Sequence, residues 1–240
     1  MTGGTAYGRV LDAVGTAIVS GEWPAGHVAT VDGVVASSGV SRSIVREVTR
    51  ELVAAGLLSA SPRVGLRVLP RSGWDLLDLR VVRWRLRVGD REAQLRELRE
   101  LRVAVEPEAA ALAALRRGHD EVAVLAESAA ALEVASTAGD EQGFLVADQR
   151  FHRALLGGSG NAMLAGLGAL IDTALEDRAL VERHGLGAAP LDVRLHADVA
   201  AAVAAGSAEH ARSSMRRIVE RTGAAGSGAP DRSDGDEEHR

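Results

Sequence analysis

Three side chains of types that commonly bind divalent metals occur in the second half of the chain. Asp148 and His152 are four residues apart, so on a helix their side chains lie on one face and can reach the same point. His196 shares a face with Val199 and Val203 on a later expected helix. One carboxylate and two imidazoles directed into a helical interior predict a site for zinc, nickel or manganese. The alternative is that each histidine is a core or boundary residue.

A row of arginines near the N-terminus is the second candidate site. Arg42, Arg46 and Arg50 recur every four residues and share one face of a helix expected over Ser41–Ala55, while apolar residues form another face. Such a helix fits the DNA major groove, because arginine binds guanine edges bidentately and a helix N-terminus offers N–H groups to phosphate. The alternative is a charged face that only solvates the helix. The expected DNA-binding residues are Ser41, Arg42, Ser43, Arg46, Arg50, Arg63, Gly65 and Arg67.

The elements that would position these arginines form a recognisable order. Apolar spacing and turn residues predict helices over Ala6–Ser20, about 30–36 and Ser41–Ala55. Two strand-like runs at 57–59 and 65–69 then predict a hairpin, whose tip can lie against the minor groove or the DNA backbone. Helix, helix, helix and hairpin is the order of a winged helix-turn-helix.

The rest of the chain predicts an all-α bundle, so the fold class is mostly α with an N-terminal winged helix-turn-helix. Arg102 falls on the apolar stripe of the first bundle helix, which is costly unless the charge is paired or faces a cavity. Glu106, one turn later, can supply that pairing. Helices are expected at 92–117, 121–137, 141–156, 162–182, 191–205 and 208–221. The expected domains are a DNA-binding domain at 1–70, a linker helix at 71–89, a helical effector-binding domain at 90–222 and a disordered tail at 223–240.

Composition narrows the function classes. The 240 residues include no cysteine, which excludes disulfides, zinc–thiolate sites and cysteine nucleophiles. No apolar run approaches the roughly 20 residues that span a bilayer, and the N-terminus lacks a signal-peptide pattern, so we expect a cytoplasmic protein without membrane contact. The net charge is −5, yet residues 1–70 hold six arginines against five acidic residues. A small basic region in an acidic chain is typical of a DNA-binding module joined to a regulatory domain.

The N-terminal motifs resemble the winged helix of the GntR family. In that family a Gly-Glu-x-x-Pro-Gly turn precedes a Gly-Val-Ser-Arg-x-x-Val-Arg-Glu recognition helix and a wing with a glycine tip. The resemblance implies that the expected DNA-binding residues around Ser41, Arg46 and Gly65 match operator-contacting positions. The chain departs from the family at Val31–Val35, where relatives carry a Glu-rich second helix with Leu-Ala. The matching motifs are Gly21-Glu22-Trp23-Pro24-Ala25-Gly26, Gly39-Val40-Ser41-Arg42-Ser43-Ile44-Val45-Arg46-Glu47, Leu52, Gly56-Leu57-Leu58 and Arg63-Val64-Gly65.

The second half resembles the FCD ligand-binding domain of FadR-like GntR regulators. The matching motifs are Asp148-Gln149-Arg150-Phe151-His152-Arg153-Ala154-Leu155, Ser159-Gly160-Asn161, His196-Ala197-Asp198-Val199 and Ala205-Gly206. The resemblance implies a metal at Asp148, His152 and His196, although the family's last histidine is Ile218 here. In relatives the metal and nearby arginines hold the carboxylate of a small organic acid. We therefore assign effector binding to Arg102, Glu106 and Asn161, with a purely structural Arg102–Glu106 pair as the competing interpretation.

These observations favour a ligand-responsive transcription regulator over an enzyme. A homodimer would bind palindromic operator DNA, and a small carboxylate effector would release a repressor. The stretch Trp74-Asp75-Leu76-Leu77-Asp78 is similar to family members that respond to sugar acids such as galactonate or gluconate. One alternative is a metal-dependent enzyme in which Asp148, His152 and His196 activate water. Another is a DNA-binding regulator whose degenerate pocket binds nothing.

Overall fold

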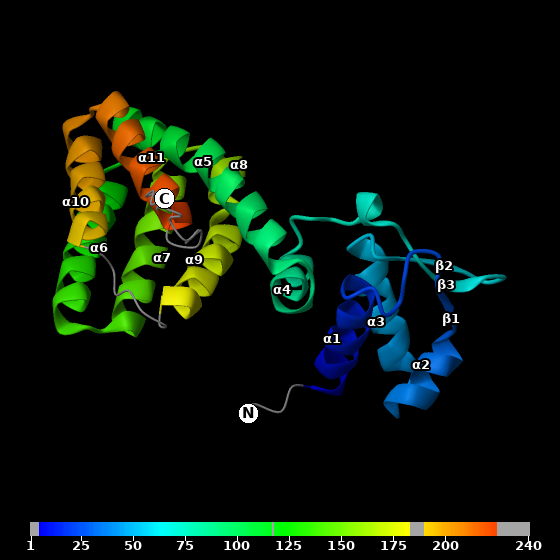
Figure 1. Ribbon diagram of the computed structural model, residues 1–240. Coiled ribbons are helices and arrows are strands. Elements are labelled where there is room, and N and C mark those ends of the chain that lie inside the picture. The colour runs from blue at the N-terminus through cyan, green and yellow to red at the C-terminus, as the bar shows by residue number, and fades with distance from the viewer. Residues whose placement is uncertain (1–4, 117, 183–189, 225–240) are drawn as a thin grey trace, which may run out of the picture. The chain divides into compact units, whose positions relative to one another are not determined.

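The chain divides into two compact units, and the division falls within one helix. The computed structural model describes residues 5–116, 118–182 and 190–224. Residues Met1–Glu97 form one unit and Leu98–Arg240 the other, and Figure 1 shows small strands only toward the N-terminal end of the chain. The boundary lies inside α5 (Arg91–Arg116), which therefore carries residues of both units.

The first unit is a winged helix, as the sequence predicts. Its sheet has the antiparallel order β1-β3-β2, in which Arg67 of β3 lies opposite Val28 on one side and Ser59 on the other. The two-residue strand β1 has too little sequence pattern to predict. The elements are α1 (Ala6–Val19), β1 (Val28–Ala29), α2 (Val31–Ser38), α3 (Arg42–Ala54), β2 (Leu58–Ser61), β3 (Gly65–Val68), the 3-10 turn η1 (Arg71–Gly73) and α4 (Leu79–Val88).

Local signals fix the turn between α2 and α3. The hydroxyl of Thr30 accepts a hydrogen bond from the Gly33 amide at 3.0 Å and caps α2. Gly39 ends α2 in the left-handed conformation, at φ 69°. Ser41 then caps α3 by accepting from the Ile44 amide at 3.4 Å. These residues thus determine where α2 begins and ends and where α3 begins, and so they define the short turn between the two helices.

Helix α4 packs on the winged helix through Trp84. The Trp84 ring is 2% exposed and lies so close to Gly15 of α1 that a Cβ there would meet it at 2.5 Å. Its indole N–H donates to Asp12 at 2.9 Å. The apolar core of this unit also contains Val45, Val48 and Leu52 of α3. Helix α4, which lies in the segment expected as a linker helix, therefore contributes to the apolar core of the DNA-binding unit.

The second unit is helical throughout the described residues. Helices α6 and α7 pack closely, and a core cluster around Phe151 and Leu155 of α7 joins them to α10 and α11. The single helix expected over 162–182 is two helices, because the chain turns at Gly166 between them. The first two residues of the tail expected at 223–240 instead end helix α11, and the rest of it lies outside the described residues. The helices are α6 (His119–Ala138), α7 (Glu141–Gly158), α8 (Ala162–Ala165), α9 (Gly168–Glu182), α10 (Pro190–Ala205) and α11 (Ala208–Ala224).

Candidate functional site

The first candidate site is the exposed face of α3. Val45, Val48 and Leu52 bury one side of this helix, at 1%, 2% and 1% exposure. Because these residues recur at helical spacing, the other side faces solvent. That solvent-facing side carries five of the predicted DNA-binding residues, all exposed: Ser41, Arg42, Ser43, Arg46 and Arg50.

The N-terminal turn of α3 is ordered by its own hydroxyls and by a neighbouring acid. The hydroxyls of Ser41 and Ser43 lie 2.9 Å apart and share a hydrogen bond. Arg42 forms an ion pair with Asp32 of α2. The helix thus presents hydroxyls, guanidinium groups and a positive helix end on one surface.

The hairpin of β2 and β3 carries the remaining predicted DNA-binding residues. Arg63 and Arg67 are exposed, whereas Leu66 and Val68 point into the core. Gly65 has φ +89°, and a Cβ there would meet the carbonyl oxygen of Ala29 at 2.6 Å. The wing therefore requires glycine at this position to pair β3 with β1.

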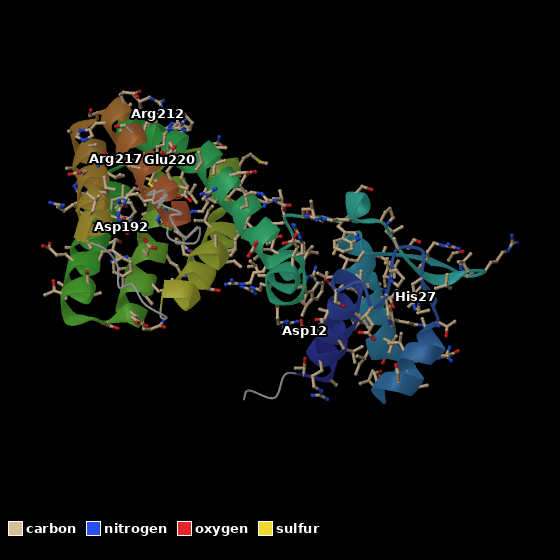
Figure 2. All side chains as sticks on the ribbon, viewed as in Figure 1. Asp12, His27, Asp192, Arg212, Arg217 and Glu220 are labelled. Carbon is tan, nitrogen blue, oxygen red and sulfur yellow. The ribbon has the colours of Figure 1, made fainter. Side chains whose placement is uncertain are left out.

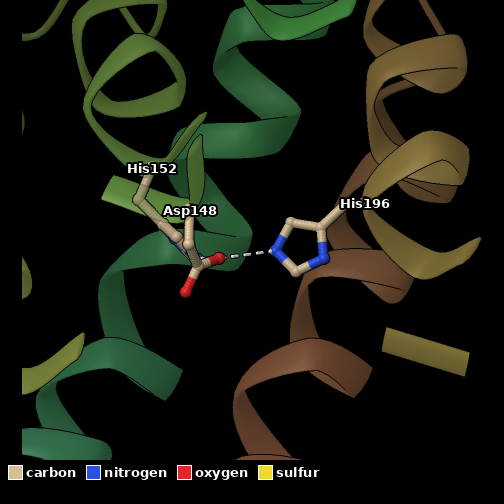
Figure 3. Close-up of side chains that lie close together, drawn as sticks. All are labelled: Asp148, His152 and His196. Carbon is tan, nitrogen blue, oxygen red and sulfur yellow. Dashed lines mark ion pairs between the residues drawn. The ribbon is translucent and has the colours of Figure 1, made fainter. Parts of the chain in front are cut away.

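The second candidate site is the buried cluster of Asp148, His152 and His196 (Figure 3). Two of these side chains come from α7 and the third comes from α10. Nε2 of His196 lies 3.1 Å and Nε2 of His152 lies 3.4 Å from the same oxygen of Asp148. All three side chains are at most 3% exposed. The potential ligand atoms lie within 4.8 Å of one another.

The neighbours of both histidines direct their Nε2 atoms toward Asp148. Nδ1 of His196 lies 2.7 Å from the backbone carbonyl oxygen of Asp192, a residue labelled in Figure 2. Nδ1 of His152 lies 2.7 Å from Oε2 of Glu106. An acceptor beside Nδ1 favours a ring proton on that nitrogen, and a ring protonated there would offer its Nε2 lone pair to a metal. Neither contact can be predicted from sequence spacing toward the cluster, because one is made by a backbone carbonyl and the other joins two separate helices.

The donor set fits a divalent metal. Two imidazole nitrogens and one carboxylate oxygen suit zinc or nickel, and the carboxylate also suits manganese. The three converging, buried donors would hold such an ion, which would act as a Lewis acid toward a bound anion. Ile218, at the position where the family has a further histidine, is fully buried in the apolar core and offers no ligand. These positions thus offer three candidate ligands.

Arg102 and Glu106 lie beside this cluster. Nε of Arg102 lies 2.5 Å from Oε1 of Glu106, and its Nη2 lies 3.5 Å from Nε2 of His152. Both side chains are buried, and they form the ion pair that their spacing in the sequence allowed. Burial alone would raise the pKa of Glu106, but the positive charge of Arg102, together with His152, lowers this pKa to about 2. Glu106 is therefore ionised at neutral pH.

Opposing effects act on the pKa of His152. Burial lowers this pKa. The negative charge of Glu106 and the contact with Asp148 together outweigh burial, so the pKa of His152 is raised above the ordinary 6.5. Two carboxylates, those of Glu106 and Asp148, thus lie beside His152, and each would favour a cation at the same place.

Asn161 is the predicted effector residue that the structure places differently. Its exposed side chain accepts a hydrogen bond from the Met163 amide at 3.0 Å and caps α8. It therefore has a local structural role, whereas Arg102 and Glu106 lie directly at the buried cluster.

Comparisons with known proteins agree with both halves of this description. The FCD domain family model matches residues 97–221, and the model for bacterial regulatory proteins of the gntR family matches residues 6–68. The galactonate operon transcriptional repressor of Escherichia coli K12 is 31% identical over 180 residues, which cover 75% of this chain and 77% of that protein. The probable D-xylose utilization operon transcriptional repressor of Paenarthrobacter nicotinovorans is 29% identical over 164 residues, or 68% and 64% of the two chains.

Solved structures share the fold. The Listeria monocytogenes protein Lar superposes with a TM-score of 0.57 at 18% identity, covering 92% of this chain and 96% of that one. E. coli McbR/YncC gives a TM-score of 0.52 at 20% identity, covering 92% and 97%. The chain belongs to the GntR family and is a DNA-binding transcription regulator with an FCD domain. Within the described residues, no helix is both long and apolar enough to cross a bilayer.

Proposed function

We propose that this chain is a repressor that binds palindromic operator DNA as a homodimer and leaves it when a small carboxylate binds in the helical unit. The observation that supports the proposal is the buried cluster of Arg102, His152, His196 and Asp148, in which a guanidinium lies beside three candidate metal ligands. Such a set holds a carboxylate by charge and hydrogen bonds. The galactonate repressor's name favours a sugar acid as the effector class.

The operator contacts proposed for this chain are those of α3 and the wing. Arg46 lies one turn into α3 on its exposed side and is the best placed of the arginines for a guanine edge. Ser41 and Ser43, with the free amides of the first turn, are suited to phosphate. Arg63 and Arg67 of the wing add contacts to the backbone or the minor groove.

A gel shift with duplexes selected by the protein from a random library tests operator binding. Arg46→Ala should weaken binding to the selected duplex about 10- to 100-fold, because a bidentate arginine–guanine contact contributes about 1–3 kcal/mol. Arg83→Ala, which removes an exposed arginine of α4, is the matched control and should leave affinity nearly unchanged. Selection that enriches no sequence would contradict the proposal.

Effector binding needs a separate test. Galactonate, gluconate and xylonate should release the selected duplex and raise the melting temperature of the protein. Arg102→Ala should abolish release while operator affinity persists, whereas Arg96→Ala, an exposed arginine on the same helix, should not. A loss of folding in Arg102→Ala would instead identify a structural arginine.

A regulator with a pocket that binds nothing is the second candidate, and two observations favour it. Ile218 is buried where the family has a ligand, and the guanidinium of Arg102 is already paired with Glu106. In that case neither zinc nor any sugar acid would change the melting temperature or the DNA affinity.

A further inference from the structure

An acidic residue of α2 pairs with the first arginine of α3. Asp32, in the first turn of α2, forms an ion pair with Arg42, the first residue of α3. Both side chains remain open to solvent, at 67% and 57% exposure. This ion pair therefore lies on the surface that presents Ser41 and Ser43.

The backbones on both sides of the ion pair are fixed. Thr30 caps α2 two residues before Asp32, and Ser41 caps α3 one residue before Arg42. Asp32 also lies at the positive end of α2, which favours its negative charge. The backbone positions from which the two side chains reach one another are thus set by helix caps.

The ion pair between Asp32 and Arg42 itself adds little to the stability of the fold. Exposed ion pairs contribute little to folding, because solvent screens the charges and the side chains lose entropy. The electrostatic effect on DNA is larger, since a carboxylate near phosphates is repelled and cancels the charge of one arginine. An acid in this place weakens attraction to DNA of any sequence.

The pairing leaves the arginine able to recognise a base. A guanidinium has five N–H donors in a rigid fork, and a carboxylate uses only some of them. The remaining donors of Arg42 can bind the O6 and N7 acceptors of guanine, while the ion pair restrains the guanidinium against a move to a phosphate.

We propose that Asp32 is a specificity-determining, positioning residue that holds Arg42 for a base edge and removes its charge from nonspecific attraction to phosphates. This inference rests on the proposed function, because it requires that α3 contacts operator DNA. Asp32 lies in the segment 31–35, where the sequence departs from the motif of its family.

The test compares Asp32→Asn with the wild type on the selected duplex and on a scrambled duplex of equal length. Affinity for the scrambled duplex should rise several-fold, and the salt dependence should steepen by about one unit of log–log slope. The ratio of selected to scrambled affinity should fall about fivefold or more. Glu22→Gln removes one exposed acid from the turn after α1 and should leave this ratio unchanged.

A double-variant cycle separates positioning from direct contact. In an Arg42→Ala background, Asp32→Asn should no longer change the affinity ratio, because the side chain that Asp32 positions is gone. Asp32→Glu should restore part of the ratio in the presence of Arg42.

Three results would overturn the inference. A ratio that falls equally in the Arg42→Ala background would mean that Asp32 contacts DNA itself. A ratio unchanged by Asp32→Asn, with a wild type that prefers the selected duplex, would defeat this inference alone. A wild type without any preference would defeat the proposed function as well.

Discussion

Glu106 and His152 form a fully buried pair, in which Oε2 of the carboxylate lies 2.7 Å from Nδ1 of the imidazole. The other oxygen of Glu106 contacts Arg102. One carboxylate therefore fixes the orientation of a candidate metal ligand and holds the candidate effector arginine. We therefore expect a substitution of Arg102 to affect the orientation of His152 through Glu106, and a substitution of His152 to affect Arg102 in the same way.

Removing the charge of Glu106 should weaken metal binding. Glu106→Gln keeps the shape of the side chain but lowers the basicity of His152, and partners of this kind typically contribute 10- to 100-fold in metal affinity. Competition of the protein with a chelating zinc indicator measures the change. Glu108→Gln, on an exposed residue of the same helix that pairs with Arg212, is the control. Equal zinc affinities in the two variants would contradict a positioning role for Glu106.

Restoring a histidine at position 218 should strengthen the site. Ile218 is fully buried, so Ile218→His will lower stability without metal, because a polar ring replaces packed apolar atoms. Zinc should then raise the melting temperature more than it does in the wild type, and tenfold tighter binding corresponds to about 1.4 kcal/mol at saturating metal. Ile218→Asn brings similar polarity without the imidazole. The same response to zinc in both variants would show that position 218 does not reach the metal.

Features of the fold and of the candidate site that depend on neighbouring residues could be predicted from the sequence, whereas contacts between distant segments could not. The turn between α2 and α3 follows from Thr30, Gly39 and Ser41, whose effects are local. The convergence of Asp148 with His152 follows from helical spacing, but the contact between His152 and Glu106 depends on how two separate helices pack. The strand β1 is too short to show a pattern, and its two residues pair with β3 only in the folded chain.

Replacing Gly65 should damage the wing. In Gly65→Ala the alanine would have to adopt a left-handed backbone conformation, at φ +89°. Its Cβ would also lie 2.6 Å from the carbonyl oxygen of Ala29. We expect a loss of about 1–3 kcal/mol in stability and weaker DNA binding, because both strain and a steric clash oppose the β1–β3 pairing. Gly39→Ala is the matched control, since Gly39 has φ +69° with no atom within 4 Å of its Cβ. Chemical denaturation should show a smaller loss for Gly39→Ala, and equal losses would argue against the close approach at Gly65.

The buried guanidinium of Arg85 predicts a pH-dependent stability of the first unit. Glu97 pairs with Arg85, which is 5% exposed, and with Arg71. Partial burial raises the pKa of Glu97. The contacts with Arg85 and Arg71 together outweigh burial, so this pKa is lowered below the ordinary 4.5. Because the folded-state pKa is lowered, this carboxylate stabilises the fold above about pH 4.5, and the stabilisation is lost as the pH falls through the folded-state pKa.

Glu97→Gln should therefore lower stability at pH 7 by about 1–2 kcal/mol, since Arg85 stays buried without a charged partner and the 40% exposure of Glu97 moderates the loss. The gap between wild type and variant should narrow between pH 5 and pH 3, because protonation removes the same charge from the wild type. Urea denaturation across this pH range measures the gap, with Glu100→Gln as an exposed control on the same helix. A gap that stays constant with pH would mean that Glu97 acts through packing rather than through its charge.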